Sequence, residues 1–202
     1  MKAARTWLIA LAATSLAGCA TTTSGPVEVT RFHLGTPLER GTVTVEPMTG
    51  GGPATLEFGT YAGAVQAELL QQGYSAPAPA ASGQYLAVVG FTRTTTEGAP
   101  RPAPFSVGLG VGGGSYGRGG GVDVGGGVSF PIGKRRSHYV TASDLSVQIR
   151  RRSDGTVIWE GRARTQADDK APDSQASVAA GKLAHALFLG FPGESGRSIT
   201  VK

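Results

Sequence analysis

Residues 138–163 read HYVTASDLSVQIRRRSDGTVIWEGRA and contain the clearest strand pattern in the chain. Apolar residues alternate with polar ones in the first half, at Leu145, Val147 and Ile149. This period of two is typical of a strand with one buried face. Asp154-Gly155 is a strong hairpin-turn signal, so residues 156–163 can pair back. The stretch therefore predicts a β-hairpin in which Val157 and Trp159 share one face and Trp159 is buried.

Further strands are predicted on both sides of this hairpin, where β-branched and apolar residues form short runs. They cover residues 27–34, 41–46, 85–94 and, as a short closing strand, 199–201. In the first of them we expect Val27, Val29 and Phe32 on the apolar face. The third is apolar almost throughout, which favours a central position in the sheet.

Two amphipathic helices are predicted from apolar residues at helical spacing. The first covers residues 56–72, stops before Gly73 and carries a stripe of Phe58, Tyr61, Val65 and Leu69. The second covers residues 174–188, starts after Pro172-Asp173 and is expected to bury Val178, Leu183 and Leu187. The expected fold is α+β: a single small domain with an antiparallel-rich sheet of about five strands and two helices packed on one face.

A glycine-rich insert occupies residues 105–133. Apolar residues recur at every second position in its two arms: Phe105, Val107, Leu109, Val111, Val122, Val124, Val128, Phe130 and Ile132. This period predicts a β-hairpin with one apolar face, and a mobile low-complexity loop is the alternative. A lone hairpin inside lipid would leave backbone groups unpaired. We therefore expect it to lie along its own domain or a partner, with Gly112–Gly121 mobile.

The first eighteen residues have the order of a secretory signal peptide. Lys2 and Arg5 supply positive charge, and a short apolar stretch leads to small residues before Cys19. That stretch is shorter than the roughly 20 apolar residues that cross a bilayer. The chain is therefore divided into a signal peptide over residues 1–18, a cysteine and flexible leash over 19–26, and one domain over 27–202.

Leu16-Ala17-Gly18-Cys19 resembles the lipobox of bacterial lipoproteins. The resemblance implies that Leu16, Ala17 and Gly18 are recognised by the signal peptidase and that the Cys19 thiol takes a diacylglycerol. Cys19 is the only cysteine of the chain, so it has no disulfide partner within it. Two or three acyl chains would give stable anchoring, whereas one binds only marginally. An ordinary signal peptide that happens to contain a cysteine is the alternative.

The charge of the chain is modest and indicates its class of partner only weakly. The net charge is +5, and loss of Lys2 and Arg5 with the signal peptide lowers it to +3 over the remaining 184 of 202 residues. An exported protein is separated from nucleic acid, so we expect no nucleic-acid partner. The expected partners are the membrane, through the lipid, and an envelope protein or cell-wall polymer.

Motifs that suggest catalysis occur only inside the glycine-rich insert. Gly108–Gly113 matches G-x-G-x-x-G, but a dinucleotide site needs a helix after this turn, which residues 115–127 cannot form. Residues 113–117 match G-x-S-x-G, with Ser115 as a candidate nucleophile, and this motif also needs a helix, an Asp and a His. Both matches are expected by chance in a run so rich in glycine. The histidines, His33, His138 and His185, are isolated from one another, so we predict no metal site and no cofactor.

Several segments together resemble a family of bacterial lipoproteins known only as domain of unknown function 4136. They are the lipobox, Leu69-Leu70-Gln-Gln-Gly73-Tyr74, Tyr85–Phe91, the hairpin with Trp159-Glu-Gly161-Arg-Ala163, and Phe191-Pro192-Gly193. The resemblance covers most of residues 27–202, and the hairpin is its most specific part. It implies a small α+β domain of a sheet with two helices, and it supplies no established activity and no catalytic residues.

These observations predict a lipid-anchored lipoprotein of the cell envelope that binds a partner and is not an enzyme. Ala20 follows Cys19, in place of the aspartate that in many enteric bacteria signals retention in the inner membrane. In a bacterium with two membranes we therefore expect the outer membrane, facing the periplasm. The alternatives are a serine hydrolase that uses Ser115 and a protein whose hairpin inserts in a membrane.

Overall fold

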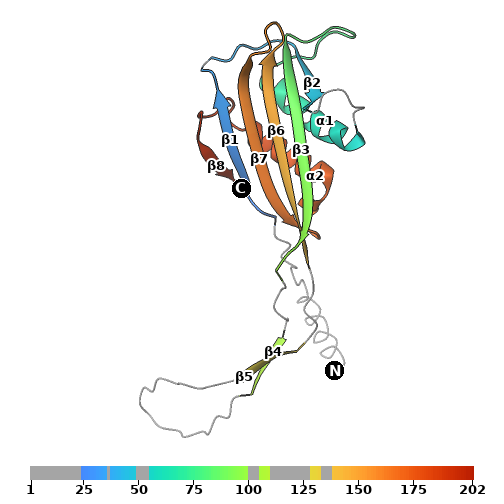
Figure 1. Ribbon diagram of the computed structural model, residues 1–202, viewed down its shortest axis with the longest axis vertical. Coiled ribbons are helices and arrows are strands. Elements are labelled where there is room, and N and C mark those ends of the chain that lie inside the picture. Colours follow the sequence, from blue (N-terminus) through green and yellow to red (C-terminus); the bar gives the residue numbers. More distant parts are fainter. Residues whose placement is uncertain (1–23, 36, 49–54, 100–104, 110–127, 133–137) are drawn as a thin grey trace, which may run out of the picture.

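A six-stranded sheet with two helices on one face makes up the main body of the protein (Figure 1). The computed structural model describes residues 24–35, 37–48, 55–99, 105–109, 128–132 and 138–202. The strands of this sheet are β1 (Val27–His33), β2 (Val43–Pro47), β3 (Tyr85–Glu97), β6 (Tyr139–Arg151), β7 (Val157–Asp168) and β8 (Ser198–Val201). The predicted α+β class is confirmed, with the closing strand as the sixth.

The strands are ordered β2-β3-β6-β7-β1-β8, and every neighbouring pair is antiparallel except β2 and β3. β2 and β3 run parallel because the helix α1 (Leu56–Gln71), which follows β2 in the sequence, returns the chain to the end of the sheet where β2 began, and β3 starts there. The predicted strand at residues 85–94 is interior, as expected, and continues three residues further to Glu97.

The β6–β7 hairpin is confirmed, and its register places the apolar residues of both strands on one face. Leu145 pairs with Ala163, Val147 with Gly161 and Ile149 with Trp159. A β-bulge after Ile149 shifts the register by one residue next to the turn. The Trp159 side chain is fully buried, as predicted from the alternation.

Helix α1 forms as predicted. Thr55 precedes it and caps its N-terminus, since the Thr55 hydroxyl accepts a hydrogen bond from the Phe58 amide at 3.0 Å. Gly73 follows the helix with φ +90°, a conformation that glycine adopts without strain. The side chains of Tyr61, Val65 and Leu69 are buried as predicted, and Phe58, the first residue of the predicted stripe, is partly buried and packs against the core.

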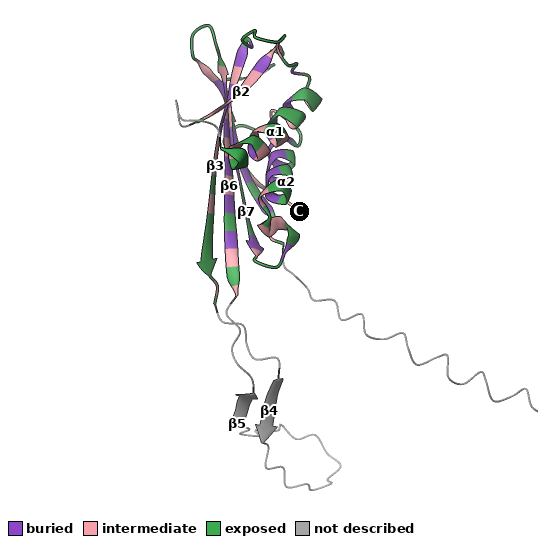
Figure 2. Cartoon of the chain, turned by 90° about the vertical axis from the view of Figure 1, so that its right-hand side faces the viewer, coloured by how far each residue is buried: buried purple, intermediate pink, exposed green. Residues whose placement is uncertain are grey.

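Helix α2 (Ala176–Phe188) begins two residues later than predicted, after a short 3-10 turn, η1 (Pro172–Ser174). Leu183 and Leu187 are buried as expected, but Val178 is 38% exposed and its assignment to the buried side was wrong. The buried stripe passes instead through small residues, Ala179, Ala180, Ala184 and Ala186. Figure 2 shows α1 and α2 together on one side of the sheet, where they pack against each other.

Strand β1 buries a charged residue where the sequence suggested an apolar one. Val27 and Val29 face the core, and the alternation continues to Arg31, which is only 4% exposed. Phe32 points to the opposite face and is 48% exposed, so its predicted place on the apolar face was wrong. Arg31 donates from Nε to the Leu187 carbonyl and from Nη2 to the Ala186 carbonyl, both at 2.8 Å. It therefore binds the C-terminal end of α2.

The insert contains a second, two-stranded sheet formed by β4 (Phe105–Leu109) and β5 (Val128–Ile132). The strands are antiparallel, so the predicted hairpin pairing is confirmed for these ten residues. The remaining apolar positions of the prediction, Val111, Val122 and Val124, and the segment Gly112–Gly121 lie outside the described residues.

Candidate functional site

No described helix or strand packs on the face of the main sheet opposite α1 and α2 (Figure 2). Successive residues of a strand point to opposite faces, so the residues between the core positions lie on it. We call this surface the open face, and it carries Glu28, Thr30, Phe32, Thr92, Thr94, Ala142, Asp144, Ser146, Gln148, Glu160, Arg162, Arg164 and Gln166. It is mostly polar, unlike the helix-covered face.

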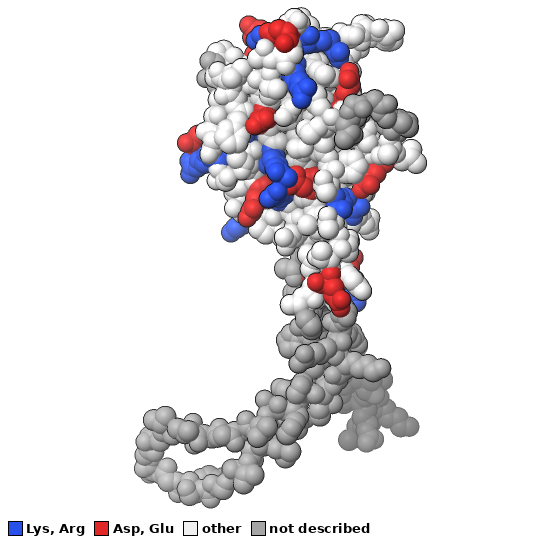
Figure 3. All heavy atoms as spheres, in the orientation of Figure 1, with Lys and Arg blue, Asp and Glu red and all other residues white. Residues whose placement is uncertain are grey.

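A cluster of opposite charges lies at the centre of the open face. Arg162 Nε donates to both carboxylate oxygens of Asp144 at 2.9 Å, and Arg164 Nε donates to Asp144 Oδ2. Both arginine side chains are 57% exposed, so their outer guanidinium nitrogens remain open to solvent. Figure 3 shows positively and negatively charged side chains next to one another near the middle of this face. Pairs so exposed add only about 0–1 kcal/mol to stability.

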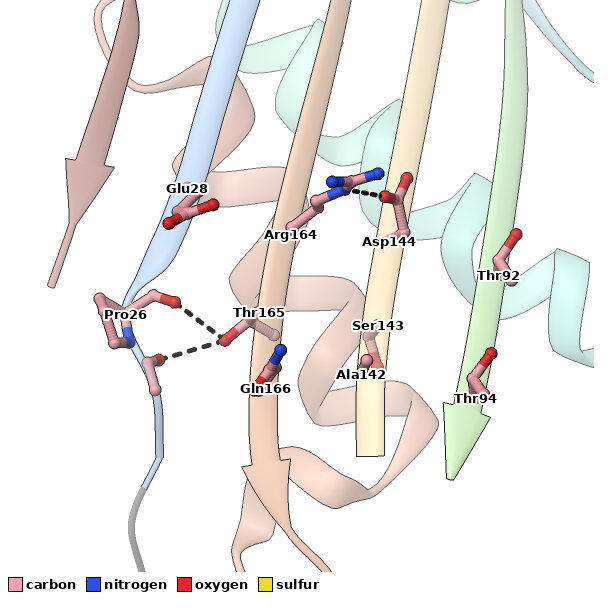
Figure 4. Close-up of a pocket in the computed structure, with 11 residues that line it drawn as sticks. Pro26, Glu28, Thr92, Thr94, Ala142, Ser143, Asp144, Arg164, Thr165 and Gln166 are labelled. Carbon is pink, nitrogen blue, oxygen red and sulfur yellow. Dashed lines mark hydrogen bonds and ion pairs between the residues drawn. The ribbon is translucent and has the colours of Figure 1, made fainter. Parts of the chain in front are cut away.

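A shallow hollow of about 530 Å³ lies beside this cluster, toward the end of the sheet where β3 ends and β6 begins (Figure 4). The small side chain of Ala142 lies in the hollow between Thr94 on β3 and Gln166 on β7. Asp144, Arg164 and Glu28 form its charged side. The hollow thus presents hydroxyl, amide, carboxylate and guanidinium groups together, which suits a polar ligand with both donors and acceptors.

A second hollow, of about 390 Å³, lies on the other side of Arg162. Phe32 and Met48 line it and are partly exposed, and Ser146 and Glu160 add polar groups. A Cβ at Gly90 would lie 2.8 Å from Ser146 Oγ and 3.1 Å from Met48 Sδ, so a larger residue there would displace these two side chains. The open face therefore combines a polar hollow and a more apolar one with the charge cluster between them.

The first described residues are held tightly at the edge of the polar hollow. The Ser24 hydroxyl donates to Asp173, and Lys182 Nζ donates to Asp173 at 2.6 Å and to the Gly25 carbonyl at 2.7 Å. Burial by itself would raise the pKa of Asp173, but the hydrogen bonds from Lys182 and Ser24 and the charge of Lys182 hold it below its usual value. This clasp is therefore complete at neutral pH and is lost only as the pH falls through that lowered pKa.

Of the residues singled out in the sequence, Leu16, Ala17, Gly18, Cys19 and Ser115 lie outside the described residues. The three histidines lie in separate places. His33 Nε2 is 3.3 Å from the Gly193 carbonyl, His138 Nε2 is 3.9 Å from Asp168 Oδ1, and His185 Nδ1 is 3.3 Å from Glu68 Oε1. Among the described residues no three His, Cys, Asp or Glu side chains are grouped as a metal site. None of the described helices is both long and apolar enough to cross a membrane.

The charge cluster on the open face was not identified from the sequence. The signal was present, because Asp144, Arg162 and Arg164 all occupy polar positions of the alternation that predicted the hairpin. Their meeting depends on the register of β6 and β7, which pairs Asp144 with Arg164.

Comparisons with known proteins give one family and several similar chains. The family model described as domain of unknown function DUF4136 matches residues 45–193. An uncharacterized protein of Zymomonas mobilis is 30% identical over 216 residues, which cover 88% of this chain and 80% of that protein. A PDZ domain protein from Parabacteroides distasonis has a TM-score of 0.41 at 13% identity, over 89% of this chain and 39% of its own. A PelC dodecamer from Paraburkholderia phytofirmans has a TM-score of 0.40 at 15% identity, and the match covers 80% of this chain and 94% of the PelC chain.

Proposed function

The chain belongs to the family described as domain of unknown function 4136, and we propose that it is a lipid-anchored lipoprotein of the cell envelope whose open face binds a partner. The lipobox-like Leu16-Ala17-Gly18-Cys19 supports the anchor. With a lipid on Cys19, the clasp at Ser24 would hold the domain five residues from the anchor. Ala20 favours the outer membrane, facing the periplasm, in a bacterium with two membranes.

The anchor is tested by Cys19→Ser, made in the full chain and expressed in a bacterium with two membranes. We expect loss of acylation and of signal cleavage at this site, because the hydroxyl cannot form the thioether that the peptidase recognises. The measurements are the mass of the mature chain and its partition into detergent. The neighbouring substitution Ala20→Ser keeps the Cys19 thiol, so acylation, signal cleavage and partition into detergent should stay as in the native chain. A Cys19→Ser protein that still partitions into detergent with an acyl mass would contradict the proposal.

Partner binding is supported above all by the charge cluster, where two half-exposed guanidiniums surround Asp144 beside a polar hollow. Such groups recognise carboxylates, hydroxyls and amides by paired hydrogen bonds. An envelope protein or a cell-wall polymer presents these groups. The function that follows is recognition by a rigid sheet surface, without chemistry on the partner.

The open face is tested by placing a photoreactive amino acid at Thr92, on the rim of the polar hollow, in living cells. The control position is Gln66, which is exposed on α1 on the other side of the sheet. We expect crosslinked products from Thr92 but not from Gln66, and their loss when Arg164→Glu reverses a charge of the cluster. Equal crosslinking from both positions, or products that Arg164→Glu leaves unchanged, would show that the open face is not the binding surface.

A further inference from the structure

A third hollow, of about 300 Å³, joins the two hollows of the open face into one trough. It lies over β7, β1 and β8, and it shares Arg164 with the polar hollow and Arg162 with the hollow beside Phe32. The three hollows therefore follow one another along β7. At about 3.3 Å per residue, the trough extends about 20 Å along this strand, from Gln166 to Glu160.

The charges along the trough nearly cancel. Three carboxylates line it, those of Glu28, Asp144 and Glu160, together with the guanidiniums of Arg162 and Arg164. Figure 4 shows Glu28, Arg164 and Asp144 on three neighbouring strands. A strongly anionic or cationic polymer would bring like charges against part of this surface, which is unfavourable. The balance of charges therefore favours an uncharged partner.

The other polar side chains of the trough are hydroxyls and amides, which can both donate and accept hydrogen bonds. They are Thr30, Thr92, Thr94, Ser146, Gln148 and Gln166. Arg164 beside Asp144 adds a charged donor next to a charged acceptor, which matches the C=O and N–H of an amide. Sugar hydroxyls and acetamido groups therefore find complementary groups along the whole trough.

The large apolar side chains that are exposed in the trough lie at one end of it. Phe32 and Met48 line the hollow at that end, whereas the charge cluster of Asp144, Arg162 and Arg164 lies at the centre. A protein–protein interface has the reverse arrangement, with an apolar centre and a polar rim. A sugar ring has polar edges and an apolar C–H face, which can pack on the face of an aromatic ring. The trough therefore suits a glycan better than a protein.

Hydrogen bonds hold several of the side chains of the trough in place before any ligand binds. Asp144 accepts hydrogen bonds from both arginines of the cluster. Gln148 Nε2 donates to Glu160 Oε2 at 3.3 Å, and the hydroxyls of Thr30 and Ser198 are 2.6 Å apart. Side chains that are already ordered lose little conformational freedom on binding. The trough can therefore bind a flexible chain at a lower entropic cost.

We infer that the partner of the open face is a glycan, an uncharged chain of sugars with hydroxyl and acetamido groups that lies along β7 with one sugar ring on Phe32. The inference rests on the proposed role of the open face in binding and names the chemistry of the partner. Arg162 and Arg164 donate to hydroxyl and carbonyl oxygens of the sugars, and Glu28 accepts hydrogen bonds from their hydroxyls. The length of the trough accommodates several sugar units.

A titration of the full chain, purified in detergent, with a short oligomer of N-acetylglucosamine tests this assignment. Backbone amide signals are followed by NMR, and we expect saturable shifts at the trough residues of β7 and β1. Oligomers of glucosamine, at a pH where the amines are protonated, and of galacturonic acid provide cationic and anionic probes of similar length. We expect both to bind at least tenfold more weakly. No saturable shift with the N-acetylglucosamine oligomer, or tighter binding of a charged oligomer, would overturn the inference.

Two variants test the orientation of the glycan in the trough. Phe32→Ala and Arg164→Gln should each weaken binding of the N-acetylglucosamine oligomer at least tenfold. Both side chains are about half exposed, at 48% and 57%, so the dispersed amide spectrum should be kept. The matched controls are Leu56→Ala at the start of α1 and Arg151→Gln at the hairpin turn, both exposed and outside the trough. Equal affinity of all four variants would contradict binding in the trough.

Crosslinking from Thr92 in living cells separates failure of the glycan from failure of the open face. Crosslinked products that contain a glycan and are lost with Arg164→Glu support the inference. Products that contain a second protein and are lost in the same variant would keep the open face as the binding surface but overturn the glycan. If the oligomer does not bind and no products form, both proposals are wrong.

Discussion

Trp159→Ala is expected to lower the free energy of unfolding by about 3–5 kcal/mol, since the indole is fully buried and its removal leaves a large cavity. The ring of Trp159 stacks on Phe188 with centroids 5.3 Å apart and lies 5.1 Å from the ring of Phe191. Its Nε1 donates to the Pro192 carbonyl at 3.0 Å. The substitution thus separates β7 from both α2 and the Phe191-Pro192-Gly193 segment.

The measurement is chemical denaturation followed by circular dichroism. Trp159→Phe keeps most of the packing and loses the indole hydrogen bond, so a smaller loss is expected. Gly161→Ala perturbs the same contact from the other side, because a Cβ at position 161 would lie 2.5 Å from Trp159 Cη2. Gly161→Ala should lower the free energy of unfolding by about 1–3 kcal/mol in the native chain. In the double variant with Trp159→Phe the further loss should be smaller, because the phenylalanine ring is smaller than the indole. A loss near zero for Trp159→Ala, or full additivity of the pair, would show that this contact does not hold the core.

The β6–β7 hairpin could be predicted because all its signals are local. The turn at Asp154-Gly155 brings the strands together, and the alternation in each strand defines a buried face. Next to the turn, Arg150 pairs with Val157. If this register continued unchanged along both strands, Leu145 would pair with Arg162, and a charged residue would be buried. The bulge after Ile149 removes this conflict and pairs Leu145 with Ala163. The alternation therefore implied the bulge, although it did not show where the bulge would form.

The position of β2 beside β3 could not be predicted in the same way. Val43 pairs with Tyr85 in a parallel ladder, across 42 residues of sequence that include α1. A short β-branched run indicates a strand but does not identify its neighbour, because pairing partners depend on how the helix packs on the sheet. The sequence therefore predicted the elements on this side of the domain but not their order.

Of the residues proposed to act, the sequence singles out only Cys19, because a lipobox-like pattern is contiguous and can be recognised from four adjacent residues. Cys19 lies outside the described residues, so its acylation stays a prediction. The open face draws Glu28, Thr92, Asp144 and Arg164 from four strands. Each is an ordinary polar position of its strand, and only the order of the strands makes them neighbours.

Arg31 shows a similar limit. Val27 and Val29 predict by their alternation that position 31 faces the core, but a charged residue there is unexpected without a known partner. The partners are carbonyls of α2, 155 and 156 residues further along the chain. The more hydrophobic Phe32 was therefore assigned to the core in its place.

Arg31→Met is expected to lower the free energy of unfolding by about 2–4 kcal/mol, because two carbonyls at the end of α2 lose charged hydrogen-bond donors. Burial lowers the pKa of Arg31, which shows that the charged form also carries a desolvation cost. Replacing a buried ion pair by apolar residues can be neutral or stabilising when both partners are replaced. Here the carbonyls of Ala186 and Leu187 belong to the main chain and stay, so the loss of donors outweighs the relief of desolvation.

The same reasoning gives the controls. Arg31→Lys keeps the positive charge near the negative end of the α2 dipole but loses the planar pair of donors, so its loss should be smaller than that of Arg31→Met. Arg162→Met removes a guanidinium of the same kind that is 57% exposed and paired only at the surface, and we expect a change below about 1 kcal/mol. Thermal unfolding should show the ranking directly, at about 2–4 °C for each kcal/mol in a domain of this size. If Arg31→Met were as stable as the native chain, the two hydrogen bonds would merely offset the burial of the charge, and Arg31 would not be needed to hold α2 against the sheet.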